Sequence, residues 1–150
     1  REKRGDKVGK TKRGKGSKIM VIADRHGLPV AAHVDSASPH EVTLIEATLD
    51  KMALPYDPGV LIGDKAYDSD KHDAMLYETR GIILVAPNRE KRSKTQDGRA
   101  LRRYKRRWQV ERVNAWLQNF RRVVVRYEFH AANFLAFVQL ACIMILLRHF

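Results

Sequence analysis

The 150-residue sequence predicts an α/β fold in which helices pack on a β-sheet. Short apolar runs alternate with segments of helical period, in the order strand, strand, helix, strand, helix, strand. The first two runs are close enough to form an antiparallel hairpin, whereas intervening helices favour parallel pairing of the later ones. A hydrophobic content of 44% over this length is sufficient for one domain with a core.

The predicted hairpin joins a strand at residues 18–24 to a strand at residues 28–34. The connecting segment ends in Gly27, which suits the positive φ that tight turns require. Residues 1–17 contain four glycines among Lys and Arg and show no hydrophobic period. They predict a basic arm or loop, and residues 18–150 the folded domain.

A helix is expected after the hairpin, because Ser38 can cap it, Pro39 suits its first position and Glu41 completes a capping box. Its buried stripe at helical spacing is predicted to be Val42, Ile45, Leu49 and Met52.

The second half of the alternation begins with a fully apolar strand at residues 60–62. A helix over residues 70–80 follows, with Ser69 or Asp70 as its cap and Gly81 at its end. Residues 82–86 predict another apolar strand, and the polar, aperiodic residues 88–98 predict a loop.

A long helix is predicted over residues 99–122, and an apolar helix over residues 131–150. The latter contains Asn133, Gln139, Arg148 and His149, and its uninterrupted apolar part is shorter than the ~20 residues that a membrane span needs. We therefore expect a core helix. Cys142, the single cysteine, lies within it, which suits a reducing cytoplasm.

Charge is segregated along the chain, whose formal net charge is +12. Residues 1–18 carry nine Lys and Arg against two acids, residues 19–88 five against eleven, and residues 89–126 fourteen against three. Basic segments around an acidic centre are typical of proteins that bind nucleic acid beside a cation, because phosphates attract Lys and Arg and divalent cations prefer carboxylates. A plain solvated surface is the alternative interpretation.

Two acids occupy informative positions. Asp64 follows the strand at residues 60–62, and the carboxyl ends of sheet strands often hold ligands. Glu111 lies among basic residues of the long helix. Each also has a structural interpretation, because Asp64 can cap the next turn and Glu111 can pair with Arg107 at i,i+4 for about 0.2–0.5 kcal/mol. If the helix packs back on the sheet, the two carboxylates converge.

Four motifs in their order along the chain resemble DDE transposases of bacterial insertion sequences. They span residues 9–16, 63–69, 107–112 and 119–122, and the resemblance, which includes the hairpin with Asp35-Ser36-Ala37, covers essentially the whole chain. It implies a ribonuclease-H-like fold, with a five-stranded mixed sheet flanked by helices, and a catalytic centre of two Asp and one Glu.

By this resemblance Asp64 corresponds to the second Asp and Glu111 to the Glu. The two are therefore the predicted catalytic residues and metal ligands, with Mg²⁺ or Mn²⁺ as the cofactor. The family signature Tyr-x2-Arg-x3-Glu-x6-Lys is met at Tyr104, Arg107 and Glu111, but Gln118 stands where the Lys is expected.

The first Asp of the family lies on a strand just before the Gly- and Lys-rich segment, and the sequence has no strand in that position. We expect that residues 18–150 form a truncated catalytic domain whose first strand and first catalytic Asp are missing. Such a chain should have little activity alone.

The resemblance also implies DNA partners, namely the ends of the element and its target, in the bacterial cytoplasm and at the nucleoid. Predicted DNA contacts are Lys12, Arg13, Lys15, Arg103, Tyr104, Arg107, Arg112, Arg121 and Arg122. A homodimer is a candidate assembly, whereas a membrane and a small-molecule substrate are not expected. Two alternatives stay open: an inactive DNA-binding remnant, and a stand-alone nuclease of similar fold whose third acid would be Asp35 or Asp68.

Overall fold

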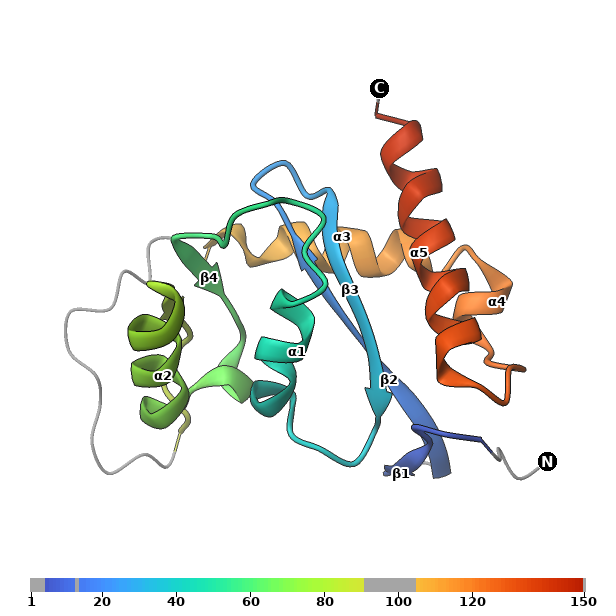
Figure 1. The fold of residues 1–150 in the computed structure, drawn as a ribbon, viewed down its shortest axis with the longest axis horizontal. Coiled ribbons are helices and arrows are strands. Elements are labelled where there is room, and N and C mark those ends of the chain that lie inside the picture. The colour runs from blue at the N-terminus through green and yellow to red at the C-terminus, as the bar shows by residue number, and fades with distance from the viewer. Residues whose placement is uncertain (1–4, 13, 91–104, 150) are drawn as a thin grey trace.

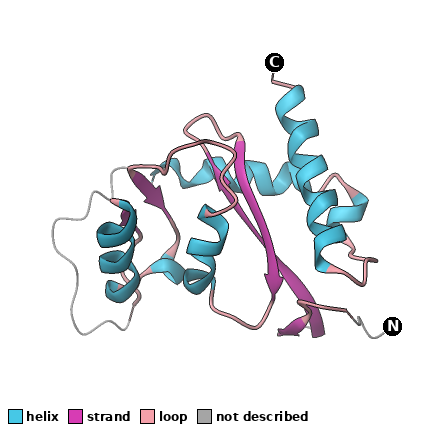
Figure 2. Cartoon of the chain, in the orientation of Figure 1, coloured by secondary structure: helices cyan, strands magenta, loops and turns pink. Residues whose placement is uncertain are grey.

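A computed structural model describes residues 5–12, 14–90 and 105–149 of the chain (Figures 1 and 2). The strands are β1 (Gly9–Thr11), β2 (Gly14–Ala23), β3 (Pro29–Ser36), β4 (Val60–Ile62) and β5 (Ile83–Val85). The α-helices are α1 (Ile45–Leu49), α2 (Asp70–Arg80), α3 (Trp108–Leu117), α4 (Arg121–Val124) and α5 (Ala131–Leu147), and two 3-10 turns are η1 (Glu41–Leu44) and η2 (Lys65–Tyr67). The predicted α/β class and element order are confirmed.

Strands β2 and β3 form the expected antiparallel hairpin, in register from Ser17↔Ser36 to Ile22↔Ala31. At the turn, Asp24 Oδ1 accepts hydrogen bonds from the main-chain N–H groups of His26 and Leu28, both at 2.8 Å. Gly27 has the expected positive φ of 75°. The turn is therefore closed by local side-chain chemistry that the sequence contains.

The prediction of an arm or loop over residues 1–17 is wrong for β1 and for the first residues of β2. Gly9–Thr11 pairs antiparallel with Gly14–Gly16. A Gly- and Lys-rich segment lacks a hydrophobic period, but its main-chain N–H and C=O groups can still pair with those of a neighbouring strand. Here Ser38 Oγ accepts the N–H of Lys10 at 3.1 Å.

That contact also explains why the predicted capping box is wrong. The chain enters η1 through His40, with no side-chain capping bond, and α1 begins only at Ile45. The Ser38 hydroxyl group bonds to β1, and His40 instead of Ser38 occupies the N-cap position of η1. Three members of the predicted stripe are nevertheless buried, Val42, Ile45 and Leu49 at 6%, 3% and 2% exposure, whereas Met52 is only partly buried.

Strands β4 and β5 pair in parallel, from Val60↔Ile83 to Ile62↔Val85, with α2 as their connection. Gly81 ends α2 in the left-handed region at φ 66°, as predicted. Among the described residues the strands form two sheets, one of three strands and one of two. The single mixed sheet that the resemblance implied is therefore not continuous between β2 and β4.

The hairpin separates two hydrophobic cores. The larger core lies against α3, α4 and α5 and consists of Ala32, Val34, Val113, Leu117, Val123, Ala131, Phe134, Val138, Ala141, Cys142 and Ile145. The smaller core lies against α1 and α2 and consists of Val42, Ile45, Leu49, Leu76, Ile82 and Leu84. Ile19, Val21 and Ala23 border the larger core and Ile22 the smaller one, as the alternation of side chains along a strand requires.

The C-terminal half differs from its prediction in detail. Helix α3 ends at Leu117, so the predicted helix over residues 99–122 is interrupted, and residues 99–104 lie outside the described residues. Helix α5 is a core helix along one face only, because Leu140, Ile143, Met144 and Leu147 are exposed. None of the helices in the described part of the chain is long and apolar enough to cross a membrane.

Candidate active site

Asp64 lies where the parallel pair ends. Gly63 extends the ladder by donating its N–H to Val85 O at 2.9 Å. Asp64 then begins η2, and its Oδ1 accepts the N–H of Ala66 at 2.8 Å. The capping interpretation of this carboxylate is confirmed, but one hydrogen bond does not exhaust a group with about four lone-pair sites.

The tyrosine of the same motif packs directly against this strand end. A Cβ atom at position 63 would lie 2.7 Å from the ring of Tyr67, so the ring can occupy this place only because residue 63 is glycine. Burial, followed by the negative charges of Glu41 and Asp64 and a hydrogen bond with Glu41, raises the pKa of the Tyr67 hydroxyl well above its usual range. The hydroxyl group stays protonated and links η1 to η2.

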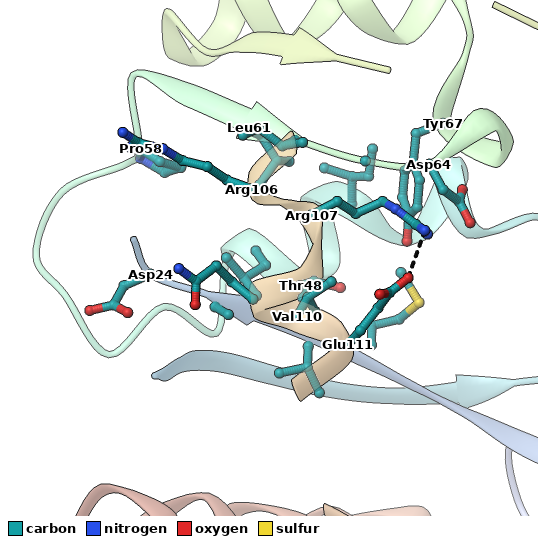
Figure 3. Close-up of a pocket in the computed structure, with 18 of the residues that line it drawn as sticks. Asp24, Thr48, Pro58, Leu61, Asp64, Tyr67, Arg106, Arg107, Val110 and Glu111 are labelled. Atoms are coloured by element: carbon teal, nitrogen blue, oxygen red, sulfur yellow. Dashed lines mark ion pairs between the residues drawn. The ribbon is translucent and has the colours of Figure 1, made fainter. Parts of the chain in front are cut away.

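Glu111 lies on the first turn of α3, which Val113 and Leu117 anchor in the larger core. Its Oε1 atom is 2.6 Å from Nη2 of Arg107 (Figure 3). The predicted i,i+4 ion pair is therefore present, and its members are 36% and 54% exposed. In water-accessible surroundings such a pair orients the carboxylate more than it stabilises the fold.

Asp64 and Glu111 line the same groove, of about 1130 Å³, although 47 positions separate them in the sequence. Figure 3 shows the Arg107 side chain extending from the N-terminal end of α3 toward both carboxylates. The groove is also lined by the acids Asp24 and Glu41 and by the cations Arg25, Lys105 and Arg106. The fold thus places the two acids that the sequence identified along one groove.

The carboxylates of Asp64 and Glu111 are suitable ligands for a hard divalent cation, but they are too few to hold one alone. Carboxylate oxygens are the protein ligands that Mg²⁺ prefers, and one or two of them with substrate phosphate are common. Within the described residues, however, no three or more His, Cys, Asp or Glu side chains are grouped so that they could hold a metal ion. Asp64 and Glu111 therefore form at most a partial set of ligands.

The alternative third acids do not line the groove. Asp35 accepts from Lys7 at 3.2 Å, from the N–H of Ser36 at 2.6 Å, and lies 3.3 Å from His33. Burial of the Asp35 carboxylate acts to raise its pKa, but these contacts outweigh burial and lower the pKa below its usual value. Asp68 is 5% exposed and accepts the N–H of Arg89 at 2.8 Å. Both carboxylates have structural partners instead.

Three of the predicted DNA-binding arginines are engaged within the protein, and one of them is Arg107 in its ion pair with Glu111. The guanidinium group of Arg112 donates to His26 O in the hairpin turn and lies 4.9 Å from the ring centres of both Trp108 and Trp116. Arg122 pairs with Glu128 and lies over the ring of Phe137. Trp108 is 50% exposed.

The other predicted DNA contacts divide into two groups. Lys12, Lys15 and Arg121 are exposed. Arg13, Arg103 and Tyr104 lie outside the described residues. Sequence reasoning treated Glu41 only as a capping residue and missed its place in the groove. No local pattern could reveal it, because it depends on the packing of η1 against η2.

Comparison with known proteins gives a consistent result. The family described as "Transposase DDE domain" matches residues 1–146. A protein of Burkholderia cepacia, named as a transposase for insertion sequence element IS402, is 36% identical over 140 residues, which are 87% of this chain and 62% of that protein. A protein of Brucella ovis, named as a transposase for insertion sequence element IS6501, is 38% identical over 135 residues, 88% of this chain and 98% of that protein. No solved structure matches.

Proposed function

Because this chain belongs to the transposase DDE domain family, we propose that it acts in DNA transposition through metal-dependent cleavage and strand transfer of DNA. One observation carries the proposal: Asp64 and Glu111 line one groove although they are far apart in the sequence. In the proposed reaction a divalent ion, Mg²⁺ or Mn²⁺, supplies activation of the oxygen nucleophile and stabilisation of the leaving oxygen.

The protein's own residues have distinct roles in this proposal. Asp64 and Glu111 hold the cation through carboxylate oxygens, and Arg107 keeps Glu111 directed into the groove. Lys105 and Arg106, which line the same groove, attract the DNA backbone. Lys12, Lys15 and Arg121 extend the basic surface, so that phosphate contacts position the DNA without reading its sequence.

We further propose that the catalytic domain is ribonuclease-H-like and that this chain holds an incomplete site. The matched residues span 62% of the IS402 relative, where further polypeptide can supply a third carboxylate, but 98% of the IS6501 relative. The absence of a three-ligand group among the described residues supports this view. It equally favours the second candidate, a DNA-binding protein without catalysis. A stand-alone nuclease has no such support, because Asp35 and Asp68 do not line the groove.

The first test is metal binding, measured by calorimetry with Mn²⁺ and Mg²⁺ in the absence of DNA. We expect weak binding that Asp64→Asn or Glu111→Gln reduces further. Asp57→Asn is the matched control, because Asp57 pairs with Arg80 away from the groove. Equal binding by all four proteins would contradict the assignment of the ligands.

The second test is DNA binding and cleavage. We expect the chain to bind duplex DNA with an affinity that falls steeply with salt, because each neutralised phosphate releases counterions. Cleavage with either metal should be weak or absent. Robust cleavage that Asp64→Asn abolishes would contradict the incomplete site, and salt-independent binding would contradict the basic surface.

A further inference from the structure

The segment between α4 and α5 exposes two aromatic side chains outside the candidate active site. Tyr127 and Phe129 are 69% and 60% exposed, and Val124 and Val125 before them are 55% and 40% exposed. None of these four residues lines the groove that holds the two candidate catalytic acids. Because burial of an aromatic ring is strongly favourable, a group of exposed rings and aliphatic side chains indicates a binding surface.

A buried arginine fixes the main chain around these rings. The side chain of Arg126 is only 7% exposed. Within its own segment it donates hydrogen bonds to Glu128 O at 2.9 Å and to Phe129 O at 2.7 Å. It also donates to Asp6 O at 2.8 Å and to the hydroxyl group of Ser17. The segment is therefore held in place before any ligand arrives, which reduces the entropy cost of binding to it.

The same bonds bring a lysine-bearing hairpin close to the rings. Ser17 belongs to β2, and the residues before it form the β1–β2 hairpin, which has exposed side chains at Lys10, Lys12 and Lys15. Gly5 approaches the loop so closely that a Cβ atom there would collide with the carbonyl oxygen of Phe129. Figure 1 shows β1, the start of β2 and the loop before α5 at the same end of the molecule.

The charges beside the rings suit a polyanion. The guanidinium group of Arg122 lies 5.4 Å from the ring centre of Tyr127, and its side chain is 52% exposed. Arg121 is exposed as well. The nearby acids are compensated, because Glu128 is 6% exposed and pairs with Arg122, and Asp6 pairs with Arg126. Cations attract phosphate groups, and exposed rings stack on the flat faces of bases.

We propose that Tyr127 and Phe129 form a stacking platform for the unpaired bases of single-stranded DNA, with the phosphates against Arg121, Arg122 and the lysines of the β1–β2 hairpin. Aromatic rings beside a basic surface bind single strands with little dependence on sequence. In a duplex the bases stack on one another and offer these rings no free face. The inference rests on the proposed function for the choice of DNA, but its test uses neither metal nor cleavage, so the two can fail separately.

The test is fluorescence anisotropy with a labelled oligothymidine of about 20 nucleotides and a duplex of the same length with G·C ends. The double variant Tyr127→Ala/Phe129→Ala should bind oligothymidine at least tenfold more weakly, because base–aromatic stacking contributes roughly 5- to 150-fold per base. Its affinity for the duplex should change less than twofold. Tyr127→Phe, which keeps the ring, should retain the affinity. Tyr77→Ala, at a position 63% exposed on α2, is the matched control and should leave both affinities unchanged.

Photochemical crosslinking gives an independent result on the unsubstituted protein. Oligothymidine that carries 5-iodouracil should crosslink to residues 121–130 on irradiation, and mass spectrometry of the digested protein locates the attachment. Should the double variant not fold, this crosslink decides.

Four results would overturn the proposal. The first three are an unchanged affinity of the double variant for oligothymidine, an equal loss of affinity for both DNAs, and crosslinks confined to the groove. The fourth is concentration-dependent self-association of the protein that the double variant abolishes, because it would assign the exposed rings to an interface between two copies of this chain.

Discussion

The two cores on either side of the hairpin differ in how they are closed. A 17-residue helix, α5, closes the larger core, whereas the smaller core has the 11-residue α2 and otherwise short elements, with five residues in α1 and three in each of β4 and β5. Glu111 is anchored in the larger core through α3, and Asp64 follows a strand that packs in the smaller core. We therefore expect the two halves of the candidate site to differ in local stability, with the unit that carries Asp64 opening first.

The largest effect is expected in the larger core. Phe134, which is 2% exposed, packs there between α5 and the hairpin. Phe134→Ala should lower the free energy of unfolding by about 3–5 kcal/mol, since it removes buried surface and leaves a cavity. Chemical denaturation measures this change. The control is Leu140→Ala on the same helix, where the side chain is 54% exposed and a change within about 0.5 kcal/mol is expected.

A smaller effect is expected in the smaller core. Leu76 is fully buried between α2 and β5. Leu76→Ala should cost about 2–3 kcal/mol, the lower part of the range for such changes, because this core borders a groove. Hydrogen exchange should accelerate more in β4 and β5 than in β3, and Tyr77→Ala, at a position 63% exposed, should leave it unchanged. Equal acceleration in all three strands would contradict the inequality of the two units.

An intermediate change tests how the hairpin turn holds α3. Gly27 has φ 75°, and a Cβ atom there would collide with the side chains of Arg112 and Gln109. Gly27→Ala should cost about 1–3 kcal/mol, because it adds backbone strain and displaces Arg112 from His26 O. Thermal unfolding measures the cost. Gly59→Ala, with open space around the position, should have little effect, and a similar cost for both variants would refute the explanation.

The smallest effect on stability is expected at the ion pair between the halves of the site. Arg107→Gln should change the free energy of unfolding by no more than about 0.5 kcal/mol, since the pair with Glu111 is largely exposed. It should nevertheless weaken DNA binding, which fluorescence anisotropy measures. Lys71→Gln on the exposed face of α2 removes the same charge as a control. Equal loss of DNA affinity in both variants would show that Arg107 acts only through net charge.

Local sequence patterns were sufficient to predict most of the elements. Periodicity and glycine positions gave the hairpin, α2 with its end at Gly81, the strand at residues 60–62 and the buried stripe of the first helix. These features follow from interactions within a few residues, which a local pattern contains. Asp64 and Glu111 were conspicuous by their positions at a strand end and on a basic helix, but their prediction as catalytic residues came from the resemblance to DDE transposases.

The contacts between these elements depend on long-range packing, which the structure reveals. Ser38 bonds to β1 instead of capping the first helix. Arg112 packs between two tryptophans and donates to the hairpin turn, and Glu41 lies beside Tyr67. Among the described residues the structure also leaves β2 and β4 unjoined across the groove. Each of these contacts links residues distant in the sequence, and such contacts are set by competition among packed surfaces that no short motif records.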